Sequence, residues 1–176
     1  MSDSVRVRSA VVADAALAAR IGREGVSTQY IGLVDRAAVD AAVQQIYTVN
    51  AVAACIERCA GAPLAEFLVV ERDGMVEGFL HFDAFGPEPE LHRLYVDSQA
   101  RGHGAGHLLM EELHERLHQG LPYILLVVEG NDRAVAFYQR HGLHVAENVN
   151  GLEYYRERMG VAFPPDTRPF RLLLMR

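Results

Sequence analysis

The chain has 176 residues and a mass of 19.5 kDa, which suits one domain with a hydrophobic core of its own. Half of its residues are hydrophobic and 23% are charged, a composition that excludes a disordered chain. The net charge is −6 and all 17 basic residues are arginines, so the chain lacks the basic face that binding to nucleic acid or to an anionic membrane requires.

Neither a membrane span nor an export signal is expected. The longest uncharged run, residues 41–56, contains glutamines, a threonine and an asparagine, and the first eight residues have no apolar core. Cys55 and Cys59 lie four residues apart on an expected helix, a spacing that suits free thiols in a reducing compartment better than a metal or redox pair. We therefore expect a cytoplasmic protein.

The first third of the chain is predicted to be mainly helical. An alternating pattern predicts a first strand at Val5–Arg8. Asp14 is expected to cap an alanine-rich helix that reaches about Gly22. Asp35 is expected to cap a second helix, within the loosely amphipathic stretch from Val26 to Pro63.

After this stretch, strands and helices alternate. The expected strands are residues 67–71, 75–83, 91–96, 123–128, 143–149 and 170–175. The expected helices are residues 105–119 and 134–140. The strand at 123–128 is wholly apolar, which predicts that it is buried on both faces. A hairpin followed by strand–helix–strand–helix–strand indicates an α+β fold with helices on the sheet faces.

A glycine-rich turn precedes the helix that begins near Ala105. It reads Arg101-Gly102-His103-Gly104-Ala105-Gly106. Its glycines allow successive backbone N–H groups to face one point, and the helix adds unpaired N–H donors and the positive end of its dipole. Arg101 can add a charged fork. We expect the turn to bind a diphosphate, although a tight turn without a ligand is the alternative.

The turn differs from two other phosphate-binding motifs. No Gly-Lys-Ser/Thr follows it, so it is not a P-loop. It also lacks the glycine spacing of a dinucleotide fingerprint, and it comes in mid-chain after a hairpin.

A second motif follows the buried strand. Residues 131–143 read Asn-Asp-Arg-Ala-Val-Ala-Phe-Tyr-Gln-Arg-His-Gly-Leu. Together with residues 101–106, this stretch resembles the acetyl-CoA loop and the following Asn-x-x-Ala-x-x-Phe-Tyr-x-x-x-Gly-Phe motif of the GCN5-related N-acetyltransferase (GNAT) family. Leu143 stands where the family has a final aromatic residue. Residues 93–96 also resemble the family's splayed fourth strand.

This resemblance implies a mixed, mostly antiparallel sheet of about six to seven strands with helices on both faces. It implies a single domain over residues 5–176, with a cofactor half at about 67–148 and acceptor-side helices at about 26–63. It also implies direct transfer of an acetyl group from acetyl-CoA, as co-substrate, to an amine in a ternary complex, with no metal required.

The resemblance also implies which residues contact acetyl-CoA. The pyrophosphate would lie on the amides of the glycine-rich turn, the pantetheine arm would pair with residues 94–96, and Asn131 would hold the arm. A backbone N–H near Leu94 or Tyr95 would polarise the thioester carbonyl. The full expected set is Leu94, Tyr95, Val96, Arg101, Gly102, His103, Gly104, Ala105, Gly106, Asn131, Ala134, Phe137 and Tyr138.

Two residues are expected to move protons. Tyr138 is the expected general acid, because its phenol can protonate the departing thiolate. Glu90, at the head of a cleft-forming strand, is the expected base for the amine, with His92 two residues on. Proton loss to water and Glu129 as the base are the alternatives.

Two other functions compete with this interpretation. One is a GNAT-like module that binds acyl-CoA without catalysis. The other is a zinc hydrolase, because His114-Glu115-Arg116-Leu117-His118 matches His-Glu-x-x-His, and His107 and Glu111 fall on the same helical stripe. A buried Leu109, Leu113 and Leu117 stripe beside these histidines argues against zinc.

The acceptor is the open part of the hypothesis. Small amines, polyamines, amino-acid-like compounds, antibiotics and peptide N-termini all fit the sequence, and the acidic charge favours a cationic one. Tyr154, Tyr155 and Phe163 either line an acceptor pocket or pack, and packing is favoured. Exposed edge strands suggest a homodimer as the assembly to test.

Overall fold

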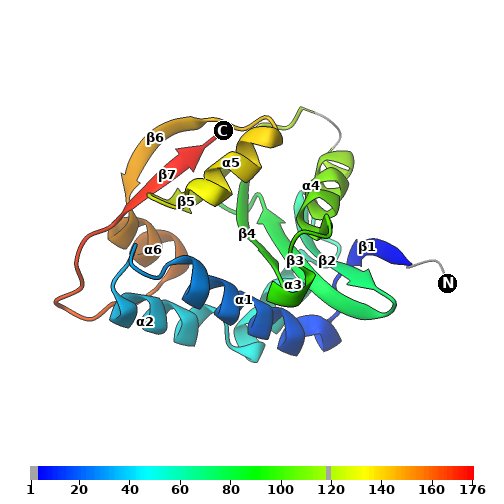
Figure 1. Ribbon diagram of the computed structural model, residues 1–176, viewed down its shortest axis with the longest axis horizontal. Coiled ribbons are helices and arrows are strands. Elements are labelled where there is room, and N and C mark those ends of the chain that lie inside the picture. Colours follow the sequence, from blue (N-terminus) through cyan, green and yellow to red (C-terminus); the bar gives the residue numbers. More distant parts are fainter. Residues whose placement is uncertain (1–3, 118–119) are drawn as a thin grey trace.

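Residues 4–117 and 120–176, the part that the computed structural model describes, form one seven-stranded sheet in the order β1-β2-β3-β4-β5-β7-β6 (Figure 1). Its strands are β1 (Val5–Ser9), β2 (Ala65–Arg72), β3 (Met75–Asp83), β4 (Glu90–Val96), β5 (Ile124–Val128), β6 (Val145–Asn150) and β7 (Arg171–Met175). Neighbouring strands are antiparallel except β4 and β5, which are parallel. The expected mixed, mostly antiparallel sheet is confirmed.

Helices cover both faces of this sheet, as expected (Figure 1). They are α1 (Ala15–Gln29), α2 (Arg36–Ile46), α3 (Val49–Cys59), α4 (Ala105–Arg116), α5 (Asp132–Arg140) and α6 (Gly151–Met159). The helices α1, α2, α3 and α6 lie on one face, and α4 and α5 lie on the other. Within the described residues, no helix is long and apolar enough to cross a membrane.

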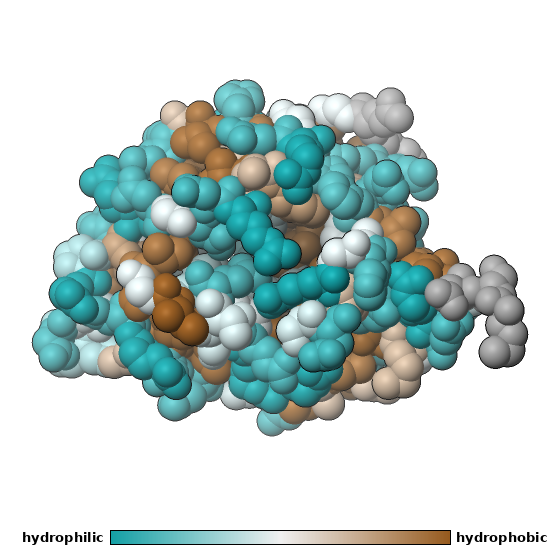
Figure 2. Space-filling model, viewed as in Figure 1, coloured by the Kyte–Doolittle hydropathy of each residue, from teal (hydrophilic) through white to brown (hydrophobic). Residues whose placement is uncertain are grey.

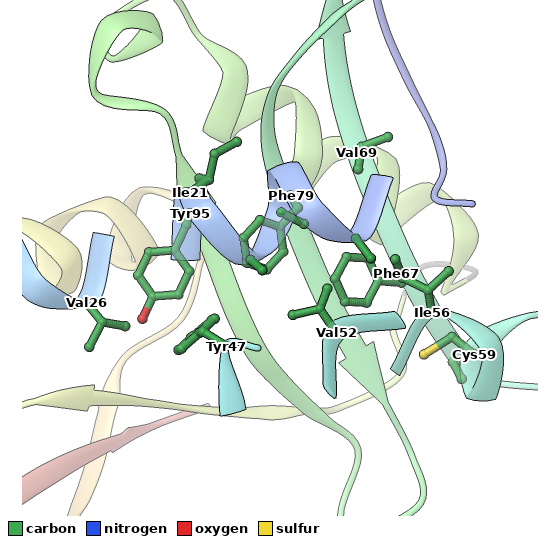
Figure 3. Close-up of a cluster of buried hydrophobic side chains, with 14 of the residues drawn as sticks. Ile21, Val26, Tyr47, Val52, Ile56, Cys59, Phe67, Val69, Phe79 and Tyr95 are labelled. Atoms are coloured by element: carbon green, nitrogen blue, oxygen red, sulfur yellow. The ribbon is translucent and has the colours of Figure 1, made fainter. Parts of the chain in front are cut away.

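Each face has its own hydrophobic core. Under α1 and α3, the rings of Phe67 and Phe79 stack 5.4 Å apart and meet Val52 and Ile56 (Figure 3). On the other face, Leu109 and its neighbours on α4 pack against the opposite sides of the same strands. The expected leucine stripe of α4 is buried, at Leu109, Leu113 and Leu117. The sheet therefore separates two cores that come from alternate residues of its strands.

Two residues that were expected to cap helices do not form the capping hydrogen bonds. Asp14 and Asp35 stand at the N-cap positions of α1 and α2, but neither side chain caps its helix. Asp14 instead forms an ion pair with Arg8 at 2.8 Å and accepts the Val11 N–H. Asp35 pairs with Arg168, 2.6 Å away. In both cases a charge-assisted bond to an arginine takes the oxygens that a cap would use.

The pattern also missed one helix and misplaced several ends. Helix α1 runs to Gln29 rather than Gly22, and α4 ends at Arg116; the expected extension to Gln119 reaches residues 118–119, which lie outside the described residues. Helix α6 was not predicted, because it is short and mostly polar. Its signals are local: Asn150 accepts the N–H groups of its first turn.

In the described sheet, the parallel strands β4 and β5 are paired at one end and separate along the rest of their length. Strands β4 and β5 pair at Glu90 with Ile124 and at Leu91 with Leu125, at their starts. Beyond Leu91, the described chain places no strand beside this edge of β4, although β3 pairs with its other edge as far as Val96. The backbone groups on that open edge of β4 are left for another partner.

A bulge at His92 turns the side chains of β4. The register passes from His81 opposite Arg93 to Phe82 opposite Leu91, so His92 is the extra residue. Leu91 therefore faces the α4 core, whereas His92 and Arg93 both lie on the side of α1 and α6. The bulge therefore places the side chains of His92 and Arg93 on the same face of the sheet.

The contact between α1 and Tyr47 yields a stability prediction. Gly22 is buried in α1, and a Cβ there would lie 2.4 Å from the Tyr47 ring. Gly22→Ala should lower the free energy of unfolding by about 1–3 kcal/mol, because overpacking outweighs the better helix propensity of alanine. Urea unfolding measures this change.

The exposed Ala16→Gly in the same helix is the control, since it should cost only the propensity difference of about 1 kcal/mol. A Gly22→Ala variant more stable than the parent chain would contradict the close packing.

Candidate active site

The glycine-rich turn adopts the geometry that its sequence predicts. Gly102 and Gly104 have φ angles of 88° and 83°, in the left-handed region that favours glycine, and Gly104 is the N-cap of α4. No side chain caps α4. The first N–H groups of this helix are therefore available to an anion, with the positive end of the helix dipole behind them.

Two neighbours hold this turn in place. Asp97 precedes the turn, accepts the Gln99 N–H at 3.0 Å and pairs with Arg20 of α1 at 2.6 Å. A Cβ at Gly106 would lie 3.3 Å from the Phe137 ring, so the absence of a side chain lets α4 approach α5 closely. The turn thus lies at a fixed place between α1 and α5.

A groove, here called the glycine groove, runs from this turn to α5 and has a volume of about 370 Å³. It collects most of the residues expected to contact acetyl-CoA: Leu94, Val96, Arg101, Gly102, Gly104, Ala105, Gly106, Asn131, Ala134, Phe137 and Tyr138. Tyr95 and His103 do not line it. Arg133 and Arg140 do, and these cations were not predicted. Both lie on α5 within the second motif, at positions where the motif pattern specifies no residue type.

A second hollow, here called the inner cavity, lies on the other side of β4. Its walls come from α1, α2, β4, β5, α5, α6 and the segment before β7. Its aromatic lining consists of Tyr30, Tyr47, Tyr95, Tyr138, Tyr155, Phe163 and Phe170. Figure 2, drawn in the view of Figure 1, shows mostly hydrophilic side chains around a hollow near the middle of this face, with hydrophobic side chains at the bottom of the hollow.

The aromatic residues after β6 both pack and line this cavity. Tyr155 and Phe163 contact each other edge to face, with centroids 6.3 Å apart, and both belong to the cavity wall. The expectation that they only pack was therefore incomplete. Tyr154 points elsewhere and donates a hydrogen bond to Glu90.

The glycine groove and the inner cavity meet at Tyr138. Both are lined by Gln29, Leu94, Asn131, Ala134 and Tyr138. The side-chain carbonyl oxygen of Asn131 accepts the Ala134 N–H at 3.3 Å, which caps α5 and leaves the side-chain N–H₂ for another partner. Burial raises the pKa of Tyr138, so its phenol is protonated at neutral pH. In the described part of the chain, nothing hydrogen-bonds to that hydroxyl.

Glu90 belongs to a buried ionic cluster, here called the β4 cluster, formed by His81, Asp83, Glu90 and His92. His92 lies between the two carboxylates, with Nε2 3.1 Å from Asp83 and Nδ1 3.3 Å from Glu90. Burial lowers the pKa of His92, but the contacts to Asp83 and Glu90 outweigh it and bring the pKa to about 9. His92 is therefore protonated at neutral pH.

The other members of the cluster respond differently to burial. Burial lowers the pKa of His81 to about 3 despite its contact with Asp83, so His81 stays neutral. Burial acts to raise the pKa of Asp83, but the two histidines hold it below its usual range. The cluster thus contains a cationic His92 and an ionised Asp83 at neutral pH.

Neither of the two expected base candidates lines the glycine groove or the inner cavity. Glu90 lies behind His92, which forms the wall of the inner cavity. Glu129, the alternative at the end of β5, is exposed and accepts a hydrogen bond from Asn148 at 3.5 Å. The structure thus brings Tyr138 and His92 to one cavity, with Glu90 one contact further away.

The histidine stripe of α4 turns toward the end of α5. His107 lies 2.8 Å from His141, and His114 lies 2.9 Å from the Tyr123 hydroxyl. His118, the last residue of the zinc-type pattern, lies outside the described residues. Among residues 4–117 and 120–176, no group of three or more His, Cys, Asp or Glu side chains is placed to hold a metal ion.

The raised pKa of His92 gives a pH-dependence prediction. Because the folded-state pKa of about 9 exceeds the ordinary 6.5, protonated His92 stabilises the fold fully below pH 6.5, and this stabilisation is lost as the pH rises through 9. The stability difference between the parent chain and His92→Gln should therefore shrink by about 2–3 kcal/mol between pH 6.5 and pH 10.

Urea unfolding at both pH values measures that difference. His144→Gln, which removes an imidazole at an exposed position, is the matched control. A constant or growing difference for His92→Gln would show that the carboxylates do not hold a proton on this ring.

Comparison with known proteins agrees with this geometry. Residues 63–144 match the family model described as an acetyltransferase (GNAT) domain. No curated protein sequence matches the chain. Many solved structures do, although at low sequence identity.

Three of these structures show how far the likeness extends. The PaiA N-acetyltransferase of Thermoplasma acidophilum, solved with coenzyme A, is 20% identical and has a TM-score of 0.75, with 96% of this chain and 97% of that chain covered. A GNAT-family acetyltransferase of Streptococcus pneumoniae is 21% identical, with a TM-score of 0.69 and 98% of both chains covered. YncA of Salmonella typhimurium, solved with its cofactor acetyl-CoA, is 17% identical, with a TM-score of 0.67 and coverages of 98% and 92%.

The family match spans the turn and the whole second motif, and the fold is shared along nearly the whole chain. Residues 63–144 therefore match an acetyltransferase (GNAT) domain, and the chain as a whole shares the fold of solved GNAT acetyltransferases.

Proposed function

We propose that the protein is an acetyl-CoA-dependent N-acetyltransferase that acts on a primary amine in a ternary complex. The observation that carries this proposal is the junction at Tyr138, where a groove lined by the glycine-rich turn and arginines meets an aromatic cavity. One hollow suits a long phosphorylated co-substrate, and the other suits the acceptor. A direct transfer requires the two to meet at one point.

The glycine groove has the donors that a CoA moiety needs. The backbone amides of residues 102–106 and the N-terminus of α4 would hold the pyrophosphate, and Arg101, Arg133 and Arg140 add positive charge along the same groove. The open edge of β4 offers the backbone of residues 94–96 to the pantetheine amides. Asn131 contributes its amide N–H₂ at the junction.

Two groups of this chain would then act on the reacting atoms. A backbone N–H near Leu94 or Tyr95 polarises the thioester carbonyl while the amine nitrogen attacks its carbon. Tyr138 gives its phenolic proton to the sulfur as the carbon–sulfur bond breaks. Its raised pKa keeps this proton in place until the thiolate forms. Solvent then reprotonates the phenol.

The amine must lose a proton before or during its attack. We propose that Glu90 receives this proton through a water molecule beside His92, since His92 separates Glu90 from the cavity. His92 itself is already protonated and does not serve as the base at neutral pH. Its positive charge also favours the neutral form of a nearby amine.

A binding module without catalysis is the competing candidate. The protonated phenol of Tyr138 at the junction favours catalysis, because acyl-CoA binding alone does not need a proton donor there. Thiol release from acetyl-CoA in the presence of a panel of amines separates the two functions. Calorimetric binding of acetyl-CoA without thiol release for any amine would identify a binding module.

The proposed acid yields the kinetic prediction. Tyr138→Phe keeps the ring but removes the proton donor, so kcat should fall about 100-fold while the KM for acetyl-CoA stays within about threefold. Steady-state thiol release measures both constants. Tyr123→Phe is the matched control, because it removes a phenol that lines neither the glycine groove nor the inner cavity, and unchanged kcat in Tyr138→Phe would remove Tyr138 from the mechanism.

A further inference from the structure

Within the part of the chain that the structure describes, one charged side chain of the inner cavity, Arg93, forms no ion pair. Arg93 of β4 is only 6% exposed and forms part of the cavity wall. Its guanidinium lies over the Tyr47 ring, 5.0 Å from the centroid. Its Nε and Nη1 atoms are buried and have no hydrogen-bond partner within residues 4–117 and 120–176. A buried unpaired cation is costly, so this site is built for a partner from outside the chain.

The nearby carboxylates do not supply that partner. Asp83 contacts His81, His92 and, at 3.9 Å, Arg58. Glu90 accepts the Tyr154 hydroxyl and contacts His92. Both acids are thus committed within the β4 cluster, and the structure records no ion pair between either of them and Arg93 in the described chain.

The phenols around Arg93 do not neutralise it either. Burial raises the pKa of Tyr47 to about 12, with Arg93 opposing that rise. Burial likewise raises the pKa of Tyr95 and Tyr155 well above the ordinary value. All three hydroxyls are neutral at pH 7, so they can donate hydrogen bonds to an anion but carry no negative charge.

We infer that Arg93 binds a carboxylate of the acceptor, and that the acceptor is an amino acid with an apolar side chain. This inference rests on the proposed function. A guanidinium fork matches a carboxylate in shape and charge. The aromatic wall suits an apolar side chain, which leaves the α-amine as the group to be acetylated.

The position of Arg93 allows it to bind the acceptor carboxylate while the α-amine lies near the co-substrate. Arg93 precedes Leu94, the β4 residue that lines both hollows, and Arg93 itself lines only the inner cavity. A carboxylate held by Arg93 therefore lies beside the strand along which the co-substrate arm would run. In an α-amino acid the amine is two bonds from the carboxylate carbon, so binding at Arg93 restricts where that amine can lie.

The test compares acceptors that differ only in the carboxylate. Thiol release from acetyl-CoA is measured with phenylalanine and leucine, with phenethylamine and 3-methylbutylamine, and with the two amino acid amides. Rates are expressed per unprotonated amine, because the amine pKa differs among these compounds. The kcat/KM for the amino acids should exceed that for the decarboxylated amines by about 100-fold.

Variants of Arg93 separate carboxylate binding from general packing. Arg93→Met should raise the KM for phenylalanine and leucine about 100-fold, while kcat/KM for phenethylamine and the KM for acetyl-CoA stay within about threefold. Arg93→Lys, which keeps the charge without the fork, should recover part of the loss. Arg58→Met is the control, because Arg58 is largely exposed and does not line the inner cavity.

Two outcomes would overturn the inference: decarboxylated amines acetylated as well as the amino acids, or the same preference in Arg93→Met as in the parent chain. Calorimetric titration of phenylalanine and leucine into the protein with coenzyme A distinguishes this failure from that of the proposed function. Binding that Arg93→Met abolishes, without thiol release, would support the carboxylate site and refute the transferase. The absence of both binding and transfer for the two amino acids would refute the carboxylate site.

Discussion

The separation of β4 from β5 is the constraint on which the candidate site depends. The two parallel strands are joined at Glu90 and Leu91 and then diverge. This gap leaves one edge of β4 without a neighbouring strand in the described sheet. Tyr138 of α5 lies at the gap, where it lines both the glycine groove and the inner cavity. A continuous parallel pairing would close this gap and satisfy the backbone of residues 94–96 internally. The glycine groove and the inner cavity would then have no common wall.

Charge in this molecule is arranged locally. The chain is acidic overall, yet each proposed anion site has its own source of positive charge: backbone amides, a helix end and arginines at the glycine groove, and Arg93 in the inner cavity. The bulge at His92 places Arg93 and His92 on one face of the sheet. The acidity that suggests a cationic acceptor is thus compatible with an acceptor that also carries a carboxylate.

The sequence predicts the cofactor side better than the acceptor side. The turn at residues 101–106 and the stretch at 131–143 are local motifs, and local backbone chemistry determines their shape. Arg93 carries no local signal, because its burial depends on the bulge opposite His81 and on Tyr47, which lies far away in the sequence in the turn between α2 and α3. The sequence singles out Glu90 by its place at the head of a strand, but its contacts with His92 and Tyr154 follow from tertiary packing and could not be predicted. Even helix caps are not fully predictable from local sequence. The carboxylates of Asp14 and Asp35 pair with arginines instead of capping their helices.

A crystal structure of the protein with coenzyme A tests the central claim most directly. The account predicts the pyrophosphate on the amides of residues 102–106, the pantetheine amides paired with the open edge of β4, and the sulfur within hydrogen-bond reach of the Tyr138 hydroxyl. Coenzyme A bound elsewhere, or a sulfur far from Tyr138 with the gap between β4 and β5 filled by protein, would contradict it.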